Sequence, residues 1–343
     1  MSSLPYVCLF SCTLILGSIL ALRGNHWIFI WIGLELNLIS FIPLLTSSHV
    51  NQEAEAAIKY FIAQALGRGL LLLGALSLLS SPHLPLNPLF YNILLIIGLL
   101  IKLGLPPCHF WFPAVIASIS WPICLILATW QKVIPVILLI YRITSSLNPL
   151  FFLIIIFRSF IGGLGGLNQT QLRPLLAYSS IGHMSWIIAA RIVSYSRRII
   201  YFLIYILISI PLISLFWNRS LYLNSSTNSL GLPTKLFRLV LVILILSLAG
   251  VPPFTGFFPK WLIIQSLSPV SITVVIIIIL GSIINLYYYL NLIFISTLKP
   301  DLPPSLYKTH SSKSFLSLPI LATSTLALGP IIFILIYALT ILN

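Results

Sequence analysis

The sequence predicts an all-α polytopic membrane protein with about eleven transmembrane helices. Of its 343 residues, 59% are hydrophobic and only 6% are charged, whereas about a quarter of an ordinary soluble domain is charged. Apolar stretches of about twenty residues recur along the chain, and each is long enough to cross a bilayer core as a helix. A helix is expected because backbone groups in a bilayer must find their hydrogen bonds within the chain.

The apolar stretches predict helices near residues 5–22, 27–45, 57–80, 89–118, 122–143, 149–167, 174–191, 199–216, 237–266, 272–296 and 317–341. We expect them to form a single membrane domain over residues 1–343. The first stretch lacks the positive n-region and the small-residue cleavage site of a secretory signal, so we expect it to be retained as a helix. No Arg- and Ser-rich transit peptide precedes it, so a mitochondrial location would imply synthesis inside the organelle.

An internal repeat is the most specific feature of the sequence. GLPPCHFWFP at 104–113 and GVPPFTGFFP at 250–259 share G-(L/V)-P-P-x4-F-P within long apolar segments. Proline removes a backbone donor and clashes with the preceding turn, so each Pro-Pro pair is expected to interrupt its helix at mid-membrane. Five helices separate the copies, so the copies should cross in opposite directions, as in transporters built from inverted repeats. This predicts repeats at about 1–145 and 149–296, with the C-terminal helix at 317–341; the alternative is a pair of ordinary kinks.

Charged residues within apolar sequence are the main indication of function. Glu35 lies in WIGLELNLISFIPLL, where a charged side chain costs about 2.5–3.5 kcal/mol and needs a partner, water or a function. Lys102, two residues before the first repeat, is its expected partner, because an opposite charge holds a lysine protonated and separating the pair would release the proton. The alternatives are a structural ion pair or a neutral acid at Glu35, and a lysine that reaches the interface at Lys102.

Two further lysines lie in apolar sequence. Lys132 is in ATWQKVIPVILL, and Lys260 directly follows the second repeat, nearer a helix end from which it could reach the interface. With Glu35 and Lys102 they give one acid and three lysines spread over both halves of the chain. That composition suits a proton relay better than a binding site for a large solute.

Four other titratable residues have weaker signals. His109 adjoins the first helix break, and His183 lies in AYSSIGHMSW beside several serines. Either histidine could hold relay water, but a packing role is at least as good an interpretation. Arg68 and Arg158 are also embedded, and the sequence suggests for them only contact with lipid headgroups or a neighbouring subunit.

Composition excludes several other classes. The net charge of +14 comes without a dense basic run or interleaved aromatic residues, so we expect membrane lipid and no nucleic acid as a partner. Four cysteines, at positions 8, 12, 108 and 124, form no CxxC or Cys/His pattern of metal spacing. Without a haem, iron–sulfur or nucleotide signature, we expect no cofactor and no metal site in this chain.

A series of motifs resembles the subunit 2 family of mitochondrially encoded NADH:ubiquinone oxidoreductase (respiratory complex I), whose members are antiporter-like. The motifs that carry the resemblance are, in order, WIGLELNLISFIPLL, EAAIKYFIAQALG, KLGLPPCHFWFP, WQKVIP, LLAYSSIGHMSW and LAGVPPFTGFFPKWL. They cover residues 27–266. The predicted helix number also resembles the shortened animal form of the family.

The resemblance implies an antiporter-like fold of two inverted five-helix units in the mitochondrial inner membrane. It maps the family's Glu–Lys pair and lysines onto Glu35, Lys102, Lys132 and Lys260 as a proton relay. It further implies that NADH, FMN, iron–sulfur clusters and ubiquinone are bound by other subunits. This chain would then contribute to a proton-translocating NADH:ubiquinone reductase without a redox site of its own, beside other membrane-arm subunits that include neighbouring antiporter-like ones.

Three positions depart from the family pattern. Cys108 stands where phenylalanine is frequent, Ala114 where glutamate is frequent, and Arg68 where a small residue is expected. The competing functions are a stand-alone Mrp-type cation/proton antiporter, which shares the inverted halves and buried lysines, and a scaffold subunit that does not pump.

Overall fold

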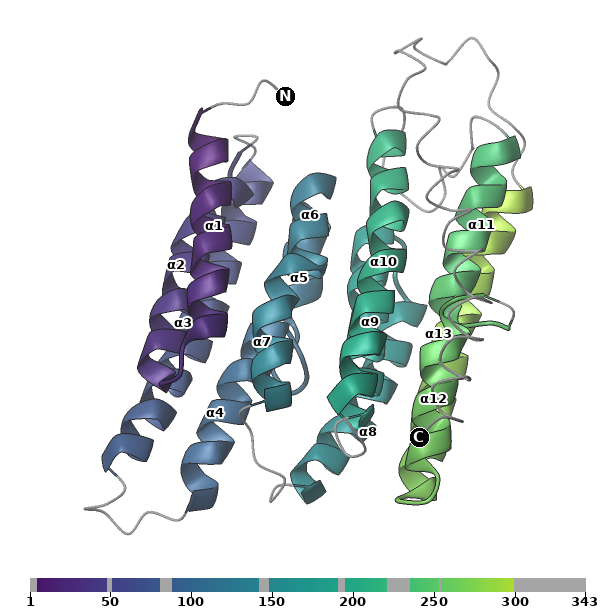
Figure 1. Cartoon of the computed structure of the whole chain (residues 1–343). Coiled ribbons are helices and arrows are strands. Elements are labelled where there is room, and N and C mark those ends of the chain that lie inside the picture. Colours follow the sequence, from purple (N-terminus) through teal and green to yellow (C-terminus); the bar gives the residue numbers. More distant parts are fainter. Residues whose placement is uncertain are drawn as a thin grey trace. The chain divides into compact units, whose positions relative to one another are not determined.

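The computed structural model describes residues 5–47, 51–80, 88–141, 148–190, 195–220, 235–252 and 254–298, most of which are helical (Figure 1). Every apolar stretch predicted up to residue 296 is helical over its described residues, apart from internal breaks, which confirms the all-α fold class. The helix predicted at 317–341 lies outside the described residues. The chain divides into two compact units, Met1–Asn148 and Pro149–Asn343.

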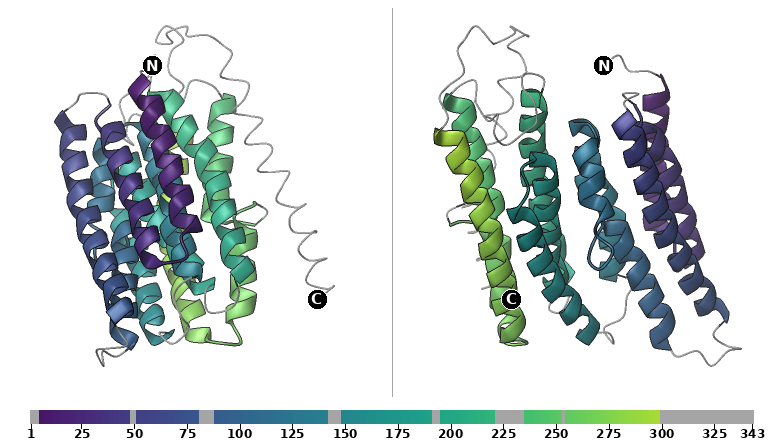
Figure 2. Two further views of the ribbon diagram at one scale, coloured as in Figure 1. Left: turned by 60° about the vertical axis from the view of Figure 1, so that its left-hand side comes forward. Right: turned by 180° about the vertical axis from the view of Figure 1, so that it is seen from behind.

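The first unit contains α1 (Pro5–Arg23), α2 (Trp27–Leu45), α3 (Asn51–Ser80), α4 (Pro88–Leu103), α5 (Trp111–Ser118), α6 (Trp121–Ala128) and α7 (Trp130–Tyr141). The second contains α8 (Asn148–Leu167), α9 (Leu172–Ala189), α10 (Tyr195–Ser220), α11 (Lys235–Ala249), α12 (Phe257–Leu267) and α13 (Ile272–Leu298). Within the first unit, the purple and blue helices run side by side in the views of Figure 2.

Helix length and composition agree with a membrane protein. Among the described residues, six segments are long and apolar enough to cross a membrane: Pro5–Arg23, Trp27–Leu45, Asn51–Leu78, Trp121–Tyr141, Ser196–Trp217 and Ile272–Leu298. Phe90–Leu103, Phe151–Leu167 and Phe237–Ala249 are shorter apolar helices. Large apolar side chains such as Leu66, Leu203 and Ile283 lie exposed on the helix surfaces, where lipid would cover them.

Both copies of the repeat end a helix in the same way. Gly104 and Gly250 have φ of 65° and 76° and follow the last residues of α4 and α11. The Gly104 N–H donates to Ile101 O and the Leu105 N–H donates to Leu100 O, both at 3.0 Å. In the second copy, the Gly250 N–H donates to Ser247 O at 3.1 Å and the Val251 N–H donates to Leu246 O at 3.3 Å. This is a Schellman motif, which requires a left-handed residue, usually glycine, just past the helix end. The predicted breaks are therefore confirmed, and the glycine that precedes each proline pair forms the helix end.

A third interruption was not predicted. The helix expected at 122–143 is divided at Thr129, which ends α6 and precedes α7. The Lys132 N–H donates to Thr129 O at 3.3 Å, a bond three residues back in place of the usual four. Pro135 lies within α7, where it lacks an N–H and its ring crowds the preceding turn. The irregular turn thus immediately precedes Lys132.

Close packing of α3 on α4 brings the first unit's polar residues together. A Cβ at Gly98 would lie 2.8 Å from Gly67 O, so only glycine permits this approach of the two helices. One turn further along α4, the Cγ of Lys102 would lie 3.4 Å from a Cβ at Gly67. Lys102 therefore lies directly against α3.

Candidate functional site: buried charges beside the helix breaks

Glu35 on α2 forms an ion pair with Arg68 on α3. The side chains are 27% and 11% exposed, so the pair is largely within the protein. The predicted pairing of Glu35 with Lys102 is therefore wrong. The physical reason is that α3 packs against both α2 and α4, and the long guanidinium side chain of Arg68 reaches the carboxylate from the helix next to it.

Lys102 occupies the last turn of α4, immediately before the first break. Its side chain is buried, and the Gln64 side-chain amide donates to its backbone carbonyl at 3.3 Å. The indole N–H of Trp111, at the start of α5, donates to Ile101 O at 3.1 Å. The bond from Gln64 satisfies a carbonyl that the end of α4 would otherwise leave without a partner, and the bond from Trp111 adds a second donor to a carbonyl that already accepts from the Gly104 N–H. A cation in the last turn is also favoured by the partial negative charge of the helix end.

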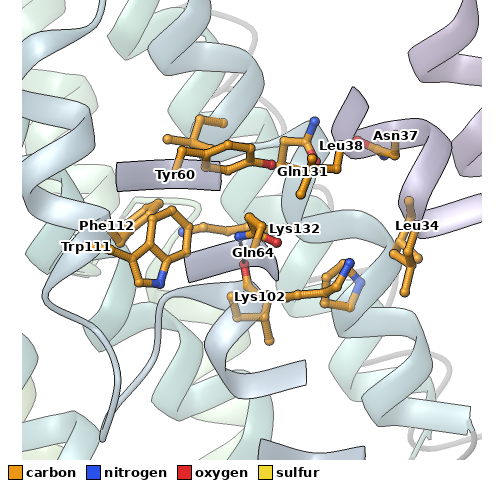
Figure 3. Close-up of a pocket in the computed structure, with 14 residues that line it drawn as sticks. Leu34, Asn37, Leu38, Tyr60, Gln64, Lys102, Trp111, Phe112, Gln131 and Lys132 are labelled. Atoms are coloured by element: carbon orange, nitrogen blue, oxygen red, sulfur yellow. Dashed lines mark hydrogen bonds between the residues drawn. The ribbon is translucent and has the colours of Figure 1, made fainter. Parts of the chain in front are cut away.

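Lys132 is buried on α7 and lies over the ring of Phe112, with its Nζ 4.6 Å from the ring centroid. This is a cation–π distance, with the aromatic face supplied by α5. Lys132 and Lys102 line one cavity from different helices, and Figure 3 draws both of them with Gln64 among the lining side chains. The first break follows Lys102 and the irregular turn at Thr129 precedes Lys132, and both lysines line the same cavity.

The cavity has a volume of about 20 Å³. Its lining side chains come from α2 to α7 and include Leu34, Asn37, Leu38, Tyr60, Gln64, Lys102, Leu103, Trp111, Phe112, Leu127, Gln131, Lys132, Ile134 and Pro135. The side-chain amide of Asn37 and the amide nitrogen of Gln131 make no hydrogen bond in the described structure. A cavity above about 10–15 Å³ with polar partners can hold a water molecule. The space suits a water that bridges the two lysines through these amides.

Several residues of this site were missed from the sequence. Tyr60, Gln64 and Arg68 are spaced by four in α3 and are all buried on one face of the helix. That spacing was visible in EAAIKYFIAQALGRG. It predicts a polar stripe facing the bundle, and only one of its members, Arg68, was singled out.

Lys260 occupies the first turn of α12, just after the second break. Its ammonium donates to Ala249 O, the last carbonyl of α11, at 2.6 Å, and lies 5.9 Å from the ring centroid of Trp186 on α9. Lys260 is 9% exposed. A Cβ at Gly250 would lie 2.8 Å from its Nζ, so a larger residue would displace the ammonium, and the positive φ of 76° also favours glycine. In each unit, therefore, a side-chain donor crosses the break to a carbonyl at the preceding helix end: Trp111 in the first and Lys260 in the second.

The two candidate histidines have different surroundings. His109 is buried in the first break, with its Nδ1 3.4 Å from Pro107 O and its ring beside Phe110 at 4.2 Å between centroids. His183 is buried on α9, with its Nδ1 2.9 Å from the Tyr201 hydroxyl. The contacts of His109 are those of a packed residue, whereas His183 belongs to a hydrogen-bonded pair.

Arg158 is fully buried in α8, and none of its three guanidinium nitrogens has a hydrogen bond in the described structure. Surface contact with lipid headgroups, which the sequence suggested, does not fit a side chain with no exposed area. Within the described residues, no group of three His, Cys, Asp or Glu side chains has metal-binding geometry. The relay candidates Glu35, Lys102, Lys132 and His109 belong to the first unit, and Lys260 and His183 to the second.

Each unit thus contains an apolar helix broken at a Gly-x-Pro-Pro motif, with a buried lysine beside the break. These features define a polytopic membrane protein of the antiporter-like class. Residues 24–285 match the family described as NADH:quinone oxidoreductase/Mrp antiporter, TM. The chain belongs to that family.

Curated relatives are similar over most of this chain. NADH-ubiquinone oxidoreductase chain 2 of Lumbricus terrestris is 38% identical over 327 residues, which covers 95% of this chain and 96% of the relative. The protein of the same name from Anopheles gambiae is 39% identical over 289 residues, covering 83% and 84%.

Solved structures share the fold. A chain of respiratory complex I from Thermus thermophilus with bound Aureothin superposes with a TM-score of 0.83 and 26% identity, covering 96% of this chain and 79% of that one. A chain of the Mrp complex from Dietzia sp. DQ12-45-1b gives a TM-score of 0.80 at 18% identity, covering 95% and 75%, which shows likeness of fold alone. The predicted antiporter-like fold is therefore confirmed.

Proposed function

We propose that this chain is a proton-translocating core subunit in the membrane arm of respiratory complex I of the mitochondrial inner membrane. Its relatives are named NADH-ubiquinone oxidoreductase chain 2, and they match nearly the whole chain. NADH oxidation and ubiquinone reduction would take place in other subunits, which would bind the nicotinamide, the FMN, the iron–sulfur clusters and the quinone. The free energy of that reaction would drive protons through this chain, whose partners are other membrane-arm subunits and lipid.

The observation that carries the proposal is the convergence of Lys102 and Lys132 on one small polar cavity. Charged side chains inside a membrane protein are costly and mark ion pathways and proton relays. A lysine binds or releases one proton without other chemistry, and a single bridging water is enough to pass it between the two amines. The cavity is far too small for an organic solute but large enough for such a water.

In the proposed relay, Glu35 and Arg68 form the entry ion pair, Lys102 and Lys132 form the centre of the first unit, and Lys260 serves the second. Arg68 replaces Lys102 as the partner that holds the carboxylate. A proton that reaches Glu35 removes its charge and weakens the pair, which changes the electrostatic field around Lys102 by Coulomb's law. The arrival of a proton at one end can therefore displace a proton at the next site.

The test is Lys132→Met in the assembled complex, reconstituted in liposomes. Methionine keeps the length and apolar body of the side chain but cannot carry a proton. We expect fewer protons to be translocated per NADH oxidised, with normal assembly on native gels. Lys59→Met is the matched control, because Lys59 lies exposed on α3 and pairs with the neighbouring Glu55. The control variant should pump normally.

Normal pumping by an assembled Lys132→Met complex would favour the scaffold function and remove the relay. The Mrp-type alternative has a separate test, since the solved Mrp complex shares this fold. Exchange of Na⁺ for H⁺ by the purified chain alone in liposomes would displace the complex I assignment.

A further inference from the structure

Both copies of the internal repeat end in a Phe-Pro pair, and in the first copy the phenylalanine contacts a buried lysine. This residue, Phe112, is the second residue of α5 and is only 1% exposed. A Cβ at Gly104 would lie 2.5 Å from the Cβ of Phe112, so the end of α4 is packed directly against it. Phe112 therefore has a fixed position relative to the first break.

Aromatic rings from three helices pack in a row that ends at Phe112. The Trp111 ring meets the Phe112 ring edge to face, with 5.6 Å between centroids. Tyr60 on α3 meets Trp111 in the same way at 5.7 Å, and Phe41 on α2 meets Tyr60 at 5.2 Å. Edge-to-face pairs add to the packing energy of buried rings and favour one mutual orientation. The row therefore holds the Phe112 ring in place from α2 through α3.

Lys132 lies over the face of this ring, and both residues line the cavity of Figure 3. The Nζ of Lys132 is 4.6 Å from the ring centroid, and the side chain comes from the first turn of α7. An aromatic face attracts an ammonium group through the negative charge of its π-system, and this attraction is absent for a neutral amine. Because Lys132 is 3% exposed, water screens the attraction little, and the ring favours the lysine that carries a proton.

The titratable groups around Lys132 come from neighbouring helices. Lys102 on α4 and Tyr60 on α3 line the same cavity, and Cys124 on α6 is close enough to interact electrostatically with Lys132. Helix α7 also packs against α1, whose charged side chain, Arg23, and two cysteines are exposed. A positive charge on Lys102 opposes a proton on Lys132 by Coulomb's law, whereas the Phe112 ring favours it.

We propose that Phe112 is a positioning residue of the relay, whose ring retains the protonated form of Lys132 and fixes that ammonium relative to the end of α4. The inference rests on the proposed proton-translocating function and adds to it a residue that is not titratable. Phe112 has no proton to exchange, so it acts only through Lys132. The proton leaves Lys132 more readily when the ring and the ammonium move apart, which ties proton release to the geometry of the first break.

The experiment measures proton pumping by the reconstituted complex as a function of pH. Phe112→Leu removes the aromatic face and keeps an apolar side chain. We expect the alkaline limb of the profile, where the lysine loses its proton, to move to lower pH by about 0.4–1.5 units, the shift that corresponds to the loss of a cation–π contact. Phe112→Tyr keeps the aromatic face and should restore the wild-type profile.

Further variants separate positioning from packing. Phe41→Leu is the matched control, because Phe41 is fully buried in the same row of rings and its ring contacts Tyr60. It should lower the melting temperature, as Phe112→Leu does, and leave the pH profile unchanged. In a Lys132→Met background, Phe112→Leu should not change the pH profile of the residual pumping, because both substitutions act on one group. Phe112→Met, with a flexible side chain that fills the same space without an aromatic face, should repeat the shift if Phe112→Leu prevents assembly.

The possible failures are distinguishable. A wild-type pH profile in the assembled Phe112→Leu or Phe112→Met complex, or an equal shift in Phe41→Leu, would overturn the positioning role. Reduced pumping in Lys132→Met would at the same time leave the proposed function standing. Normal pumping by Lys132→Met would overturn both.

Discussion

Replacing Gly104 with alanine tests the geometry that ends α4 and places Lys102 beside the first break. Gly104 has a φ of 65°, and a Cβ there would lie 2.5 Å from the Cβ and 2.8 Å from the Cγ of Phe112. Phe112 is almost completely buried in α5 and cannot swing aside. The substitution therefore has two separate costs, one in the backbone and one in packing.

The left-handed conformation costs a non-glycine residue about 1–2 kcal/mol. Overpacking of a rigid, filled site typically costs a further 1–3 kcal/mol or so. Alanine restricts the unfolded chain and returns about 0.4–1 kcal/mol. The net loss expected for Gly104→Ala is about 1–4.6 kcal/mol of unfolding free energy, which is large for a folded protein.

The assay is the thermal stability of the detergent-purified complex, followed by the melting of this subunit and by its assembly on native gels. Gly69→Ala is the matched control, because Gly69 lies in α3 and nothing comes within 4 Å of a Cβ built there. It should leave stability unchanged or raise it by up to about 1 kcal/mol through helix propensity. If Gly104→Ala and Gly69→Ala melted alike, the Schellman end of α4 and its packing on α5 would be refuted.

Two other substitutions have directional outcomes. Gly250→Ala repeats the experiment in the second unit, where the new Cβ meets the flexible end of Lys260. We expect the ammonium to move away from the Ala249 carbonyl, so that proton pumping falls. The loss of stability should be smaller than in Gly104→Ala, because the Lys260 side chain can move. Equal stability losses at the two glycines would contradict this. Arg68→Gln leaves Glu35 without its ion-pair partner in a largely buried setting. It should lower the unfolding free energy by about 1–3 kcal/mol, less than the loss of a partner from a fully buried pair. Arg68→Lys should restore part of the melting temperature, and no rescue by this variant would show that the charge of Arg68 is not what stabilises the pair.

Much of the fold could be predicted from local sequence because each property depends on nearby residues. Runs of apolar residues specify helices wherever lipid replaces water, and the described helices follow those runs. The Gly-x-Pro-Pro motif specifies a helix end because glycine tolerates positive φ and proline cannot continue the helix. The interruption at Thr129 was missed because its signals, a threonine and a proline six residues later, are also compatible with a continuous membrane helix. The boundaries of the two repeats stay a prediction.

The candidate site was less predictable, because a contact between helices depends on register and packing. Sequence by itself determined that Glu35, Lys102, Lys132 and Lys260 lie in apolar surroundings, since the cost of burying charge follows from the neighbouring residues. Only the tertiary structure decided that Glu35 pairs with Arg68, that Lys102 and Lys132 share a cavity, and that Lys260 donates to the carbonyl across its own break. The physical reason is that hydropathy depends on the composition of one segment, whereas a hydrogen bond or ion pair requires two segments at a fixed distance and rotation.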